Sequence, residues 1–162
     1  MNIFYLNEDP VVAAREHNDK HCVKMIVEYA QMLSTAHRAC DGDDKADSLS
    51  LYKRAHINHP STIWVRENKA QYNWLYRLFV ALAGEYRYRY EKTHSTYLLL
   101  GAALEEPPNK ITRNKPFNPP PQCMPEEYKC DDAVKAYHNF YIGEKAHFSS
   151  WKKRDAPKWY LK

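Results

Sequence analysis

The chain has 162 residues, of which 44% are hydrophobic and 27% charged, and this composition is typical of one globular domain. Only four glycines occur, which argues against a barrel, a sandwich or a dinucleotide-binding fold, because those folds need glycine at turns and phosphate loops. The net charge of +4 excludes a histone-like protein and by itself supports nucleic-acid binding only weakly.

Other features of the composition indicate where the protein works. The sequence has no run of about 18 apolar residues, and its opening leads straight into polar sequence, so we expect neither a membrane span nor a signal peptide. The four cysteines have no CxxC spacing, which indicates reduced thiols in an intracellular, cytoplasmic protein. Thirteen tyrosines and four tryptophans exceed what a small core hides, and exposed rings beside Lys and Arg suit base stacking or a protein interface.

Apolar periodicity and capping residues predict a single all-α domain over residues 1–162, with about five to six helices. Ahead of the first helix, Met1–Leu6 is a short apolar segment that is extended or tucked under the core. We expect helices at about 10–16, 19–40, 60–68, 70–90, 93–104 and 131–142. The polar segment 41–50 is expected to be a loop.

Three of the expected helices carry start signals, and the one at 19–40 is expected to begin near Asn18 or Asp19 as its cap. Asp9 is a suitable N-cap because Pro10 follows it at the first helical position. The helix at 93–104 is expected to have Thr93 or Ser95 as its cap.

The helix expected at 70–90 has a broad apolar face, which we expect to pack against the helix at 19–40. Its arginines are expected on or near the polar side, at Arg77, Arg87 and Arg89.

Two segments of the second half lack helical periodicity. Residues 105–126 hold seven of the ten prolines and are predicted to form a long proline-rich surface loop, at least partly ordered. A loop of roughly 20 residues in a compact domain is usually functional or disordered. Residues 151–162 form a basic aromatic tail, in which tryptophans and a tyrosine alternate with Lys and Arg.

A mixed polar stripe runs along the helix predicted at 19–40. His21, Lys24, Glu28, Gln31 and Thr35 have the spacing that puts side chains on one side of a helix. A carboxylate beside cations can act as a general base, orient water or stabilise developing positive charge. The alternative is an ordinary ion pair between Lys24 and Glu28 on a solvated face, worth a few tenths of a kcal/mol.

No metal or cofactor is predicted. His56 and His59 have i, i+3 spacing but lack a third ligand at a fixed distance, so local hydrogen bonding by His59 next to a proline is favoured. The six-residue gap between Cys123 and Cys130 matches no standard zinc knuckle. A phosphate-binding Walker loop and the GxSxG and HExxH motifs do not occur.

The order of Asp19, His21 and Glu28 resembles the pyrimidine-dimer DNA glycosylase/AP-lyase family, of the endonuclease V type. In that family a D-x-H-L-x-x-E-Y-R-E run carries the catalytic glutamate nine residues after the aspartate, and Glu28 keeps that spacing. The segment 59–66, HPSTIWVR, followed by a long helix ending in RYRY, is similar to bacterial members with H-P-x-x-x-M-W before a helix. The closing PKWY at 157–160 resembles the aromatic tail of the phage member.

The resemblance implies a DNA N-glycosylase, with or without lyase activity, that acts on a damaged or modified base. It makes Glu28, His21 and Lys24 the candidate catalytic residues. Glu28 would polarise the attacking group and stabilise an oxocarbenium-like sugar, while His21 and Lys24 would hold phosphate or tune Glu28. The candidate substrate-binding residues are Asp19, Lys20, His59, Trp64, Arg66, Trp159 and Tyr160.

The chain departs from the family pattern at two places. The family's lyase reaction uses the α-amine of a threonine exposed after removal of methionine, whereas this chain begins Met1-Asn2. Val27 and Tyr29 stand where the family has arginines beside the glutamate. The attacking group is therefore left open between an N-terminal amine, Lys24 and water.

Two other classes of function remain alternatives. One is a non-catalytic module that binds nucleic acid or a nucleotide, or an interaction protein that uses the proline-rich loop. The other is a hydrolase or transferase acting on a nucleotide or another small ligand. We expect DNA as the partner and no membrane, and steep salt dependence would distinguish DNA binding from binding of a free nucleotide. The sequence predicts no oligomeric state.

Overall fold

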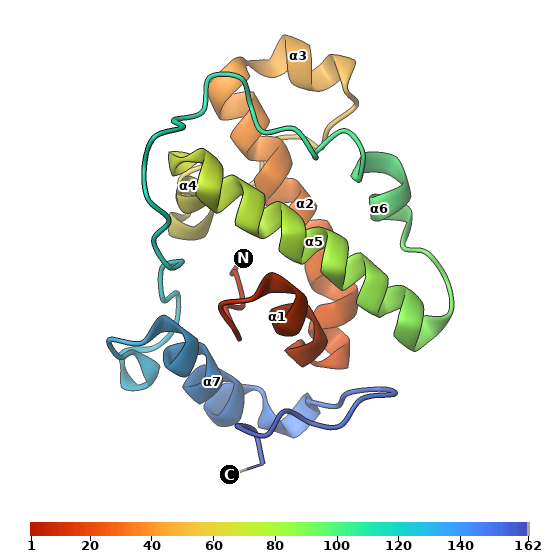
Figure 1. Cartoon of the computed structure of the whole chain (residues 1–162), viewed down its shortest axis with the longest axis vertical. Helices are drawn as coiled ribbons and strands as arrows, with labels where there is room; N and C mark the ends of the chain where they lie inside the picture. Colours follow the sequence, from red (N-terminus) through yellow and green to blue (C-terminus); the bar gives the residue numbers. More distant parts are fainter. Residues whose placement is uncertain (162) are drawn as a thin grey trace.

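The computed structural model describes residues 1–161, and its regular structure there is entirely helical, which confirms the all-α prediction (Figure 1). The helices are α1 Pro10–Glu16, α2 Asp19–Asp41, α3 Asp43–Ser48, α4 Pro60–Glu67, α5 Lys69–Tyr90, α6 Ser95–Leu100 and α7 Ala133–Glu144. Two short 3-10 helices, η1 at Glu126–Tyr128 and η2 at Ala146–Phe148, flank α7. Within the described residues, no helix is long and apolar enough to span a membrane.

The start signals of the first helices are confirmed by their capping hydrogen bonds. The Asp9 side chain accepts from the amide of Val11, and the Asn18 side chain accepts from the amide of His21. Each bond satisfies an amide that the first turn of a helix leaves without a partner. The first residue of α2 is therefore Asp19, as predicted.

Helix α3 corrects the expectation of a loop at 41–50. Gly42 ends α2 with a φ of 94°, a conformation that suits glycine, and the chain turns into α3. The side chain of Arg38, which is buried, forms ion pairs with Asp43 at 3.1 Å and with Asp47 at 2.9 Å. This tertiary anchor holds a six-residue helix that has no apolar periodicity of its own.

Helix α5 crosses α2 and packs on it, as predicted (Figure 1). Helices α1 and α4 also pack against this pair, and the apolar opening residues from Ile3 to Leu6 are buried beneath them. The prediction that Met1–Leu6 is tucked under the core is therefore confirmed for these four residues.

Two details of α5 and α6 differ from expectation. Arg89 is fully buried, because the guanidinium bonds to two carboxylates, Glu85 and Asp19, inside the fold. Helix α6 is shorter than expected, and its cap is His94, whose side chain accepts from the amide of Thr96. An imidazole nitrogen can cap a helix in the way an Asp or Ser oxygen does, but it is not among the preferred capping residues.

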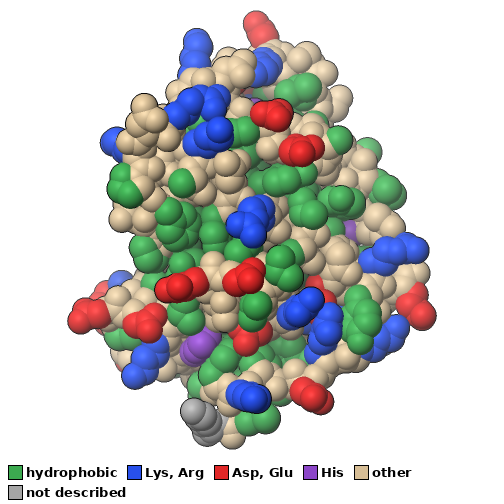
Figure 2. Space-filling view, in the orientation of Figure 1, with side chains coloured by type: hydrophobic (Ala, Val, Ile, Leu, Met, Phe, Trp, Pro, Cys, Tyr) green, Lys and Arg blue, Asp and Glu red, His purple; other side chains and the backbone are tan. Residues whose placement is uncertain are grey.

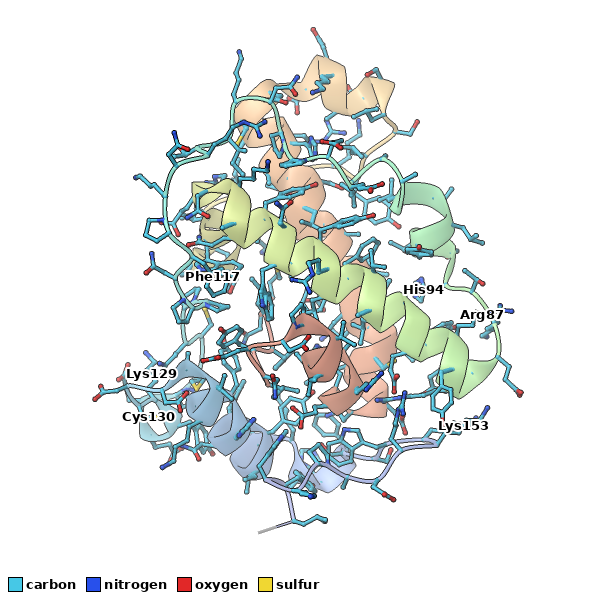
Figure 3. The ribbon with its side chains drawn as sticks, viewed as in Figure 1. Arg87, His94, Phe117, Lys129, Cys130 and Lys153 are labelled. Atoms are coloured by element: carbon cyan, nitrogen blue, oxygen red, sulfur yellow. The ribbon has the colours of Figure 1, made fainter. Side chains whose placement is uncertain are left out.

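The proline-rich loop runs along one side of the molecule between α6 and α7, and Phe117 on it lies beside α4 (Figure 3). Its backbone is bound to the helices at several points: Trp64 Nε1 donates to the carbonyl of Asn118, and Asp41 accepts from two loop amides. Phe117 packs against the Trp64 ring at 5.7 Å. The loop is therefore ordered by tertiary contacts, without regular structure before η1.

The tail folds back over the start of α2 and the end of α5. Asp19 accepts hydrogen bonds from the Lys152 amide and the Ser150 hydroxyl, and Trp151 Nε1 donates to the carbonyl of Glu16. Arg154 binds both carboxylate oxygens of Glu85 at 3.0 Å. These contacts hold residues 150–154 against the helices, with the Trp151 side chain buried and the side chains of Ser150, Lys152 and Lys153 exposed.

Candidate functional site

Glu28 projects from the middle of α2 between two cations. Its Oε1 lies 3.8 Å from the α-amine nitrogen of Met1, and its Oε2 lies 3.6 Å from Nζ of Lys24. The Glu28 side chain is 16% exposed, whereas that of Lys24 is 64% exposed. The predicted ion pair between Lys24 and Glu28 is thus present, and the chain terminus adds a second amine that the stripe alone does not contain.

Two cavities meet at this carboxylate. The first, here called the N-terminal cavity, has a volume of about 300 Å³ and is lined by Met1, Asn2, Phe4, His21, Lys24, Met25, Glu28, His59, Cys123, Phe140 and Lys145. The second, here called the histidine cavity, has a volume of about 560 Å³ and is lined by Met1, Val23, Lys24, Val27, Glu28, Gln31, His56 and His94. Met1, Lys24 and Glu28 belong to both, so a ligand in either cavity reaches the carboxylate and both amines.

The N-terminal segment is held firmly enough to keep its amine in place. The Met1 side chain is 3% exposed, and its sulfur accepts a hydrogen bond from the Thr62 hydroxyl at 3.5 Å. The Phe4 ring stacks on the His21 ring with 4.0 Å between centroids, and the Phe4 amide donates to the Tyr29 hydroxyl. Chain ends that are not tied down in this way are poorly ordered.

His21 forms part of the wall of the N-terminal cavity. Its Nδ1 lies 2.6 Å from the Tyr141 hydroxyl, and the ring is buried. Burial, with smaller contributions from neighbouring cations, lowers the pKa of His21 to about 2. The imidazole is therefore neutral at ordinary pH and carries no charge with which to hold a phosphate.

Two lysines line the N-terminal cavity, and a third lies close to one of them. Lys24 and Lys145 line it, and the ammonium groups of Lys20 and Lys145 lie 4.6 Å and 5.9 Å from the centre of the same Phe148 ring. Partial burial first, and then the charges of Lys24 and Lys20, lower the pKa of Lys145. A cluster of cations beside a half-buried carboxylate is suited to a polyanion whose reacting centre is close to a phosphate.

His59 lies in the N-terminal cavity, as expected for a site residue, and it also caps α4. Its Nδ1 accepts from the Ser61 amide at 3.1 Å, which confirms the local hydrogen bond predicted from its place before Pro60. Burial, followed by the nearby α-amine, lowers the pKa of His59. His56 lies instead in the histidine cavity. Among the residues that the structure describes, no group of three or more His, Cys, Asp or Glu side chains is arranged to hold a metal ion.

Of the seven predicted substrate-binding residues, His59 alone lines one of the two cavities, and three of the others are engaged in contacts within the fold. Asp19 is occupied by Arg89 and by the tail, as described above. Trp64 is buried in an aromatic cluster, and Arg66 donates to the carbonyl of Ile57 at 2.8 Å. Each of these three side chains makes contacts within the fold, and their contact with a substrate stays a prediction.

The two aromatic residues of the tail are also engaged within the molecule. The Trp159 ring stacks on the His138 ring, with 3.9 Å between the ring centroids and 5° between the ring planes. The Trp159 Nε1 donates a hydrogen bond to the Glu16 carboxylate at 3.0 Å. The Tyr160 ring packs edge-on against Trp151, with 4.8 Å between centroids. Neither ring lines the cavities beside Glu28, so stacking on an opened base pair would require the tail to move.

A third cavity of about 500 Å³ lies between α1, α5 and the tail. Figure 2 shows apolar side chains gathered over α1 and α5, with Lys and Arg side chains among them. The cavity's carboxylate, Glu85, is bound by Arg89 and Arg154 and is buried. A carboxylate neutralised in this way has no free role as a base, so we place the candidate chemistry at Glu28 instead.

Most of the residues that line the two cavities were not predicted from the sequence. Asn2, Cys123, Phe140 and Lys145 reach the N-terminal cavity from segments far apart in the chain, and His94 reaches the histidine cavity from the cap of α6. No local pattern marks these residues, because what joins them is the packing of α7 and the proline-rich loop against the start of the chain. A clue was available for His94 alone, since a histidine just before a helix start is unusual.

A family model described as pyrimidine dimer DNA glycosylase matches residues 1–98, which is 98 of the 162 residues. The matched part contains α1 to α5, Glu28 and both amines, and it ends within α6. No curated protein and no solved structure matches the chain.

Proposed function

The chain belongs to the pyrimidine dimer DNA glycosylase family, and on that premise we propose that it cleaves the N-glycosidic bond of a damaged or modified pyrimidine in DNA, using Glu28 and an adjacent amine. The observation that carries the proposal is the 3.8 Å separation between the Glu28 carboxylate and the Met1 α-amine at the junction of two cavities. A nucleophile beside a base is the usual signature of covalent catalysis.

The reaction follows from these two groups. Glu28 takes a proton from the ammonium, and the freed nitrogen lone pair attacks C1′ of the deoxyribose. The bond between C1′ and the base breaks, and the base leaves with the electron pair. Glu28 gives the proton that it has taken to the departing base, and its restored negative charge then stabilises the positive charge on the nitrogen joined to the sugar. Transfer of a second proton from that nitrogen through Glu28 to the ring oxygen opens the sugar and gives an iminium link between protein and DNA. Removal of a proton from C2′ and loss of the 3′ phosphate by elimination would then give lyase activity.

Met1 is a better candidate nucleophile than Lys24. The Met1 side chain is packed against α4 and holds the amine beside the carboxylate. The Lys24 side chain is 64% exposed, and a solvated ammonium on a flexible chain is a poor nucleophile. We assign to Lys20, Lys24 and Lys145 the binding of DNA phosphates beside the N-terminal cavity.

The remaining cavity residues would bind the substrate without reacting with it. His59 is placed to donate a hydrogen bond into the N-terminal cavity, and neutral His21 supports the Phe4 ring in its wall. We propose that Trp159 and Tyr160 take part only if the tail is displaced by DNA. A base taken out of the stack costs a few kcal/mol, which contacts in the cavities must offset.

The test uses duplexes carrying ultraviolet dimers, abasic sites or modified pyrimidines, with borohydride added to trap an iminium. We expect a covalent adduct with the wild-type protein. Glu28→Gln keeps the shape of the side chain and removes its charge, so it should lower the trapping rate at least about 10²-fold while DNA still binds. Glu105→Gln, at an exposed position outside the cavities, is the matched control and should behave as wild type.

Each result has a definite meaning. Mass mapping of the adduct identifies the residue that carries the attacking amine, Met1, Asn2 after removal of methionine, or Lys24. Release of free base without an adduct would assign the attack to water. Full activity of Glu28→Gln would refute the proposed role of this carboxylate, and the absence of any product would favour a DNA-binding module without chemistry.

A further inference from the structure

The second residue of the chain is held by residues more than 110 positions away. The Asn2 side-chain amide donates to the carbonyl of Cys123 at 2.8 Å. The Tyr137 hydroxyl donates to the Asn2 side-chain oxygen at 2.7 Å, and that oxygen also accepts the amide of Ile3 at 2.9 Å. The nitrogen of the Asn2 side-chain amide is thus bound to the proline-rich loop, and its oxygen is bound to α7.

Tyr137 joins these partners through a single atom. Its hydroxyl oxygen lies 2.7 Å from Asn2 and 2.6 Å from the carbonyl of Pro121, so one proton is shared between two acceptors. The Tyr137 ring is fully buried, which leaves the hydroxyl no alternative partner in water. The next residue of α7, His138, lies 2.7 Å from the carbonyl of Leu6 through its Nε2. Helix α7 therefore binds the N-terminal segment through two side chains, Tyr137 at Asn2 and His138 at Leu6.

We propose that Tyr137 is a positioning residue for the reaction at Glu28, acting through Asn2 to keep the α-amine of Met1 at the carboxylate. This inference rests on the proposed function, because it concerns the same amine. Asn2 directly follows the residue that carries the amine, so loss of the hydrogen bond from Tyr137 loosens the backbone next to the amine while the Met1 side chain stays packed on α4. Covalent attack needs the reacting atoms about 3–3.5 Å apart, and a displacement of about 1 Å costs roughly 10²-fold in rate.

The inference also gives a role to the part of the chain beyond residue 98, where the family match ends. Pro121, Cys123 and Tyr137 all lie in that part, and Cys123 also lines the N-terminal cavity. The proline-rich loop places two carbonyl groups at fixed positions, because its prolines restrict the backbone. The part of the chain after residue 98 thus completes a site that begins with the N-terminal segment and α2.

Tyr137→Phe tests this, because it keeps the ring and its packing and removes only the hydroxyl. At saturating duplex, the rate of borohydride trapping should fall about 10- to 100-fold, while the affinity for DNA stays within about twofold. Tyr76→Phe is the matched control: its hydroxyl donates to the carbonyl of Gly101 at 2.6 Å and lies away from both cavities at Glu28. It should leave both the trapping rate and the affinity unchanged. Thermal unfolding of the two variants corrects for any general loss of stability.

A second measurement follows the amine without DNA. Acylation of the α-amine by an amine-selective reagent near neutral pH, read by mass spectrometry of the N-terminal peptide, should be severalfold faster in Tyr137→Phe than in wild type or Tyr76→Phe. Equal labelling in all three proteins, or equal trapping rates, overturns the inference while the proposed function stands. Faster labelling in Tyr137→Phe, together with no adduct from any protein and any duplex, supports the anchor and refutes the proposed reaction.

Discussion

Replacement of Arg89 by methionine is the most direct test of how the core is held together. The guanidinium is fully buried in α5, where it donates to Glu85 at 2.9 Å and to Asp19 at 3.0 Å. It also donates to the carbonyls of Arg15 and His17, each at 2.9 Å. Arg89→Met keeps most of the side-chain volume and removes all four hydrogen bonds.

The expected loss of stability follows from the burial of the partners. Removal of one member of a buried ion pair typically costs about 3–5 kcal/mol, because the other charge is left without compensation. Glu85 keeps Arg154, and Asp19 keeps the Lys152 amide, so the cost should lie near the lower end of that range. For a chain of this length, about 3 kcal/mol corresponds to a decrease in Tm of about 6–12 °C.

Urea unfolding followed by circular dichroism measures this loss. Arg87→Met is the control on the same helix, because Arg87 is exposed and bonds only to the Thr93 hydroxyl (Figure 3). Arg87→Met should change the free energy of unfolding by less than about 0.5 kcal/mol. If Arg89→Met costs no more than this control, the buried network does not stabilise the fold in the way described.

Two further predictions concern pH and backbone conformation. Burial lowers the pKa of His17 to about 4, below its ordinary value of 6.5, so the unfolded chain takes up a proton as the pH falls through 6.5 while the folded chain does not until about pH 4. His17 should therefore cost no stability above pH 6.5 and up to about 1.4 kcal/mol per pH unit below it. Because the pKa of buried His21 is lowered as well, His17→Gln should reduce the slope found by urea unfolding from pH 7 to pH 5 by about that amount without abolishing it. Gly84 lies in the middle of α5 with nothing within 4 Å of an added Cβ, so Gly84→Ala should stabilise the protein by about 0.5–1 kcal/mol in thermal unfolding. Gly42→Ala should instead destabilise it by about 1 kcal/mol, because φ is 94° there; a gain at Gly42 would contradict the described end of α2.

Local signals in the sequence were sufficient for most helices. Asp9 and Asn18 cap the helices that they were expected to cap, and the spacing of polar residues correctly put Lys24 and Glu28 on one side of α2. These features depend on contacts within four residues, which a sequence displays directly. The short helix α3 was not predicted because it is stabilised by ion pairs with Arg38, a residue of α2, and the pattern of residues 43–48 does not show these contacts.

Burial of charged residues was the feature that local patterns predicted least well. Arg89 has the polarity of a surface residue, and only the convergence of α1, α2 and α5 places carboxylates and carbonyls around it. Trp159 and Tyr160 likewise have the composition of an exposed nucleic-acid contact, yet they pack on His138 and Trp151. The type of a residue indicates which interactions its side chain is able to make, but the residues that it contacts in the fold belong to segments distant in sequence.

The sequence by itself determined that the chain is helical, where its main helices begin, and that Glu28 follows Asp19 at the spacing of a glycosylase family. The helical fold and the helix starts follow from propensity, capping and periodicity, which act over a few residues, whereas the spacing is a resemblance between motifs. Only the tertiary structure decided that the α-amine of Met1 lies beside Glu28, that two cavities meet there, and that Tyr137 holds Asn2. Each of these depends on contacts between residues that lie up to 135 positions apart, and such contacts are fixed by the packing of the whole chain.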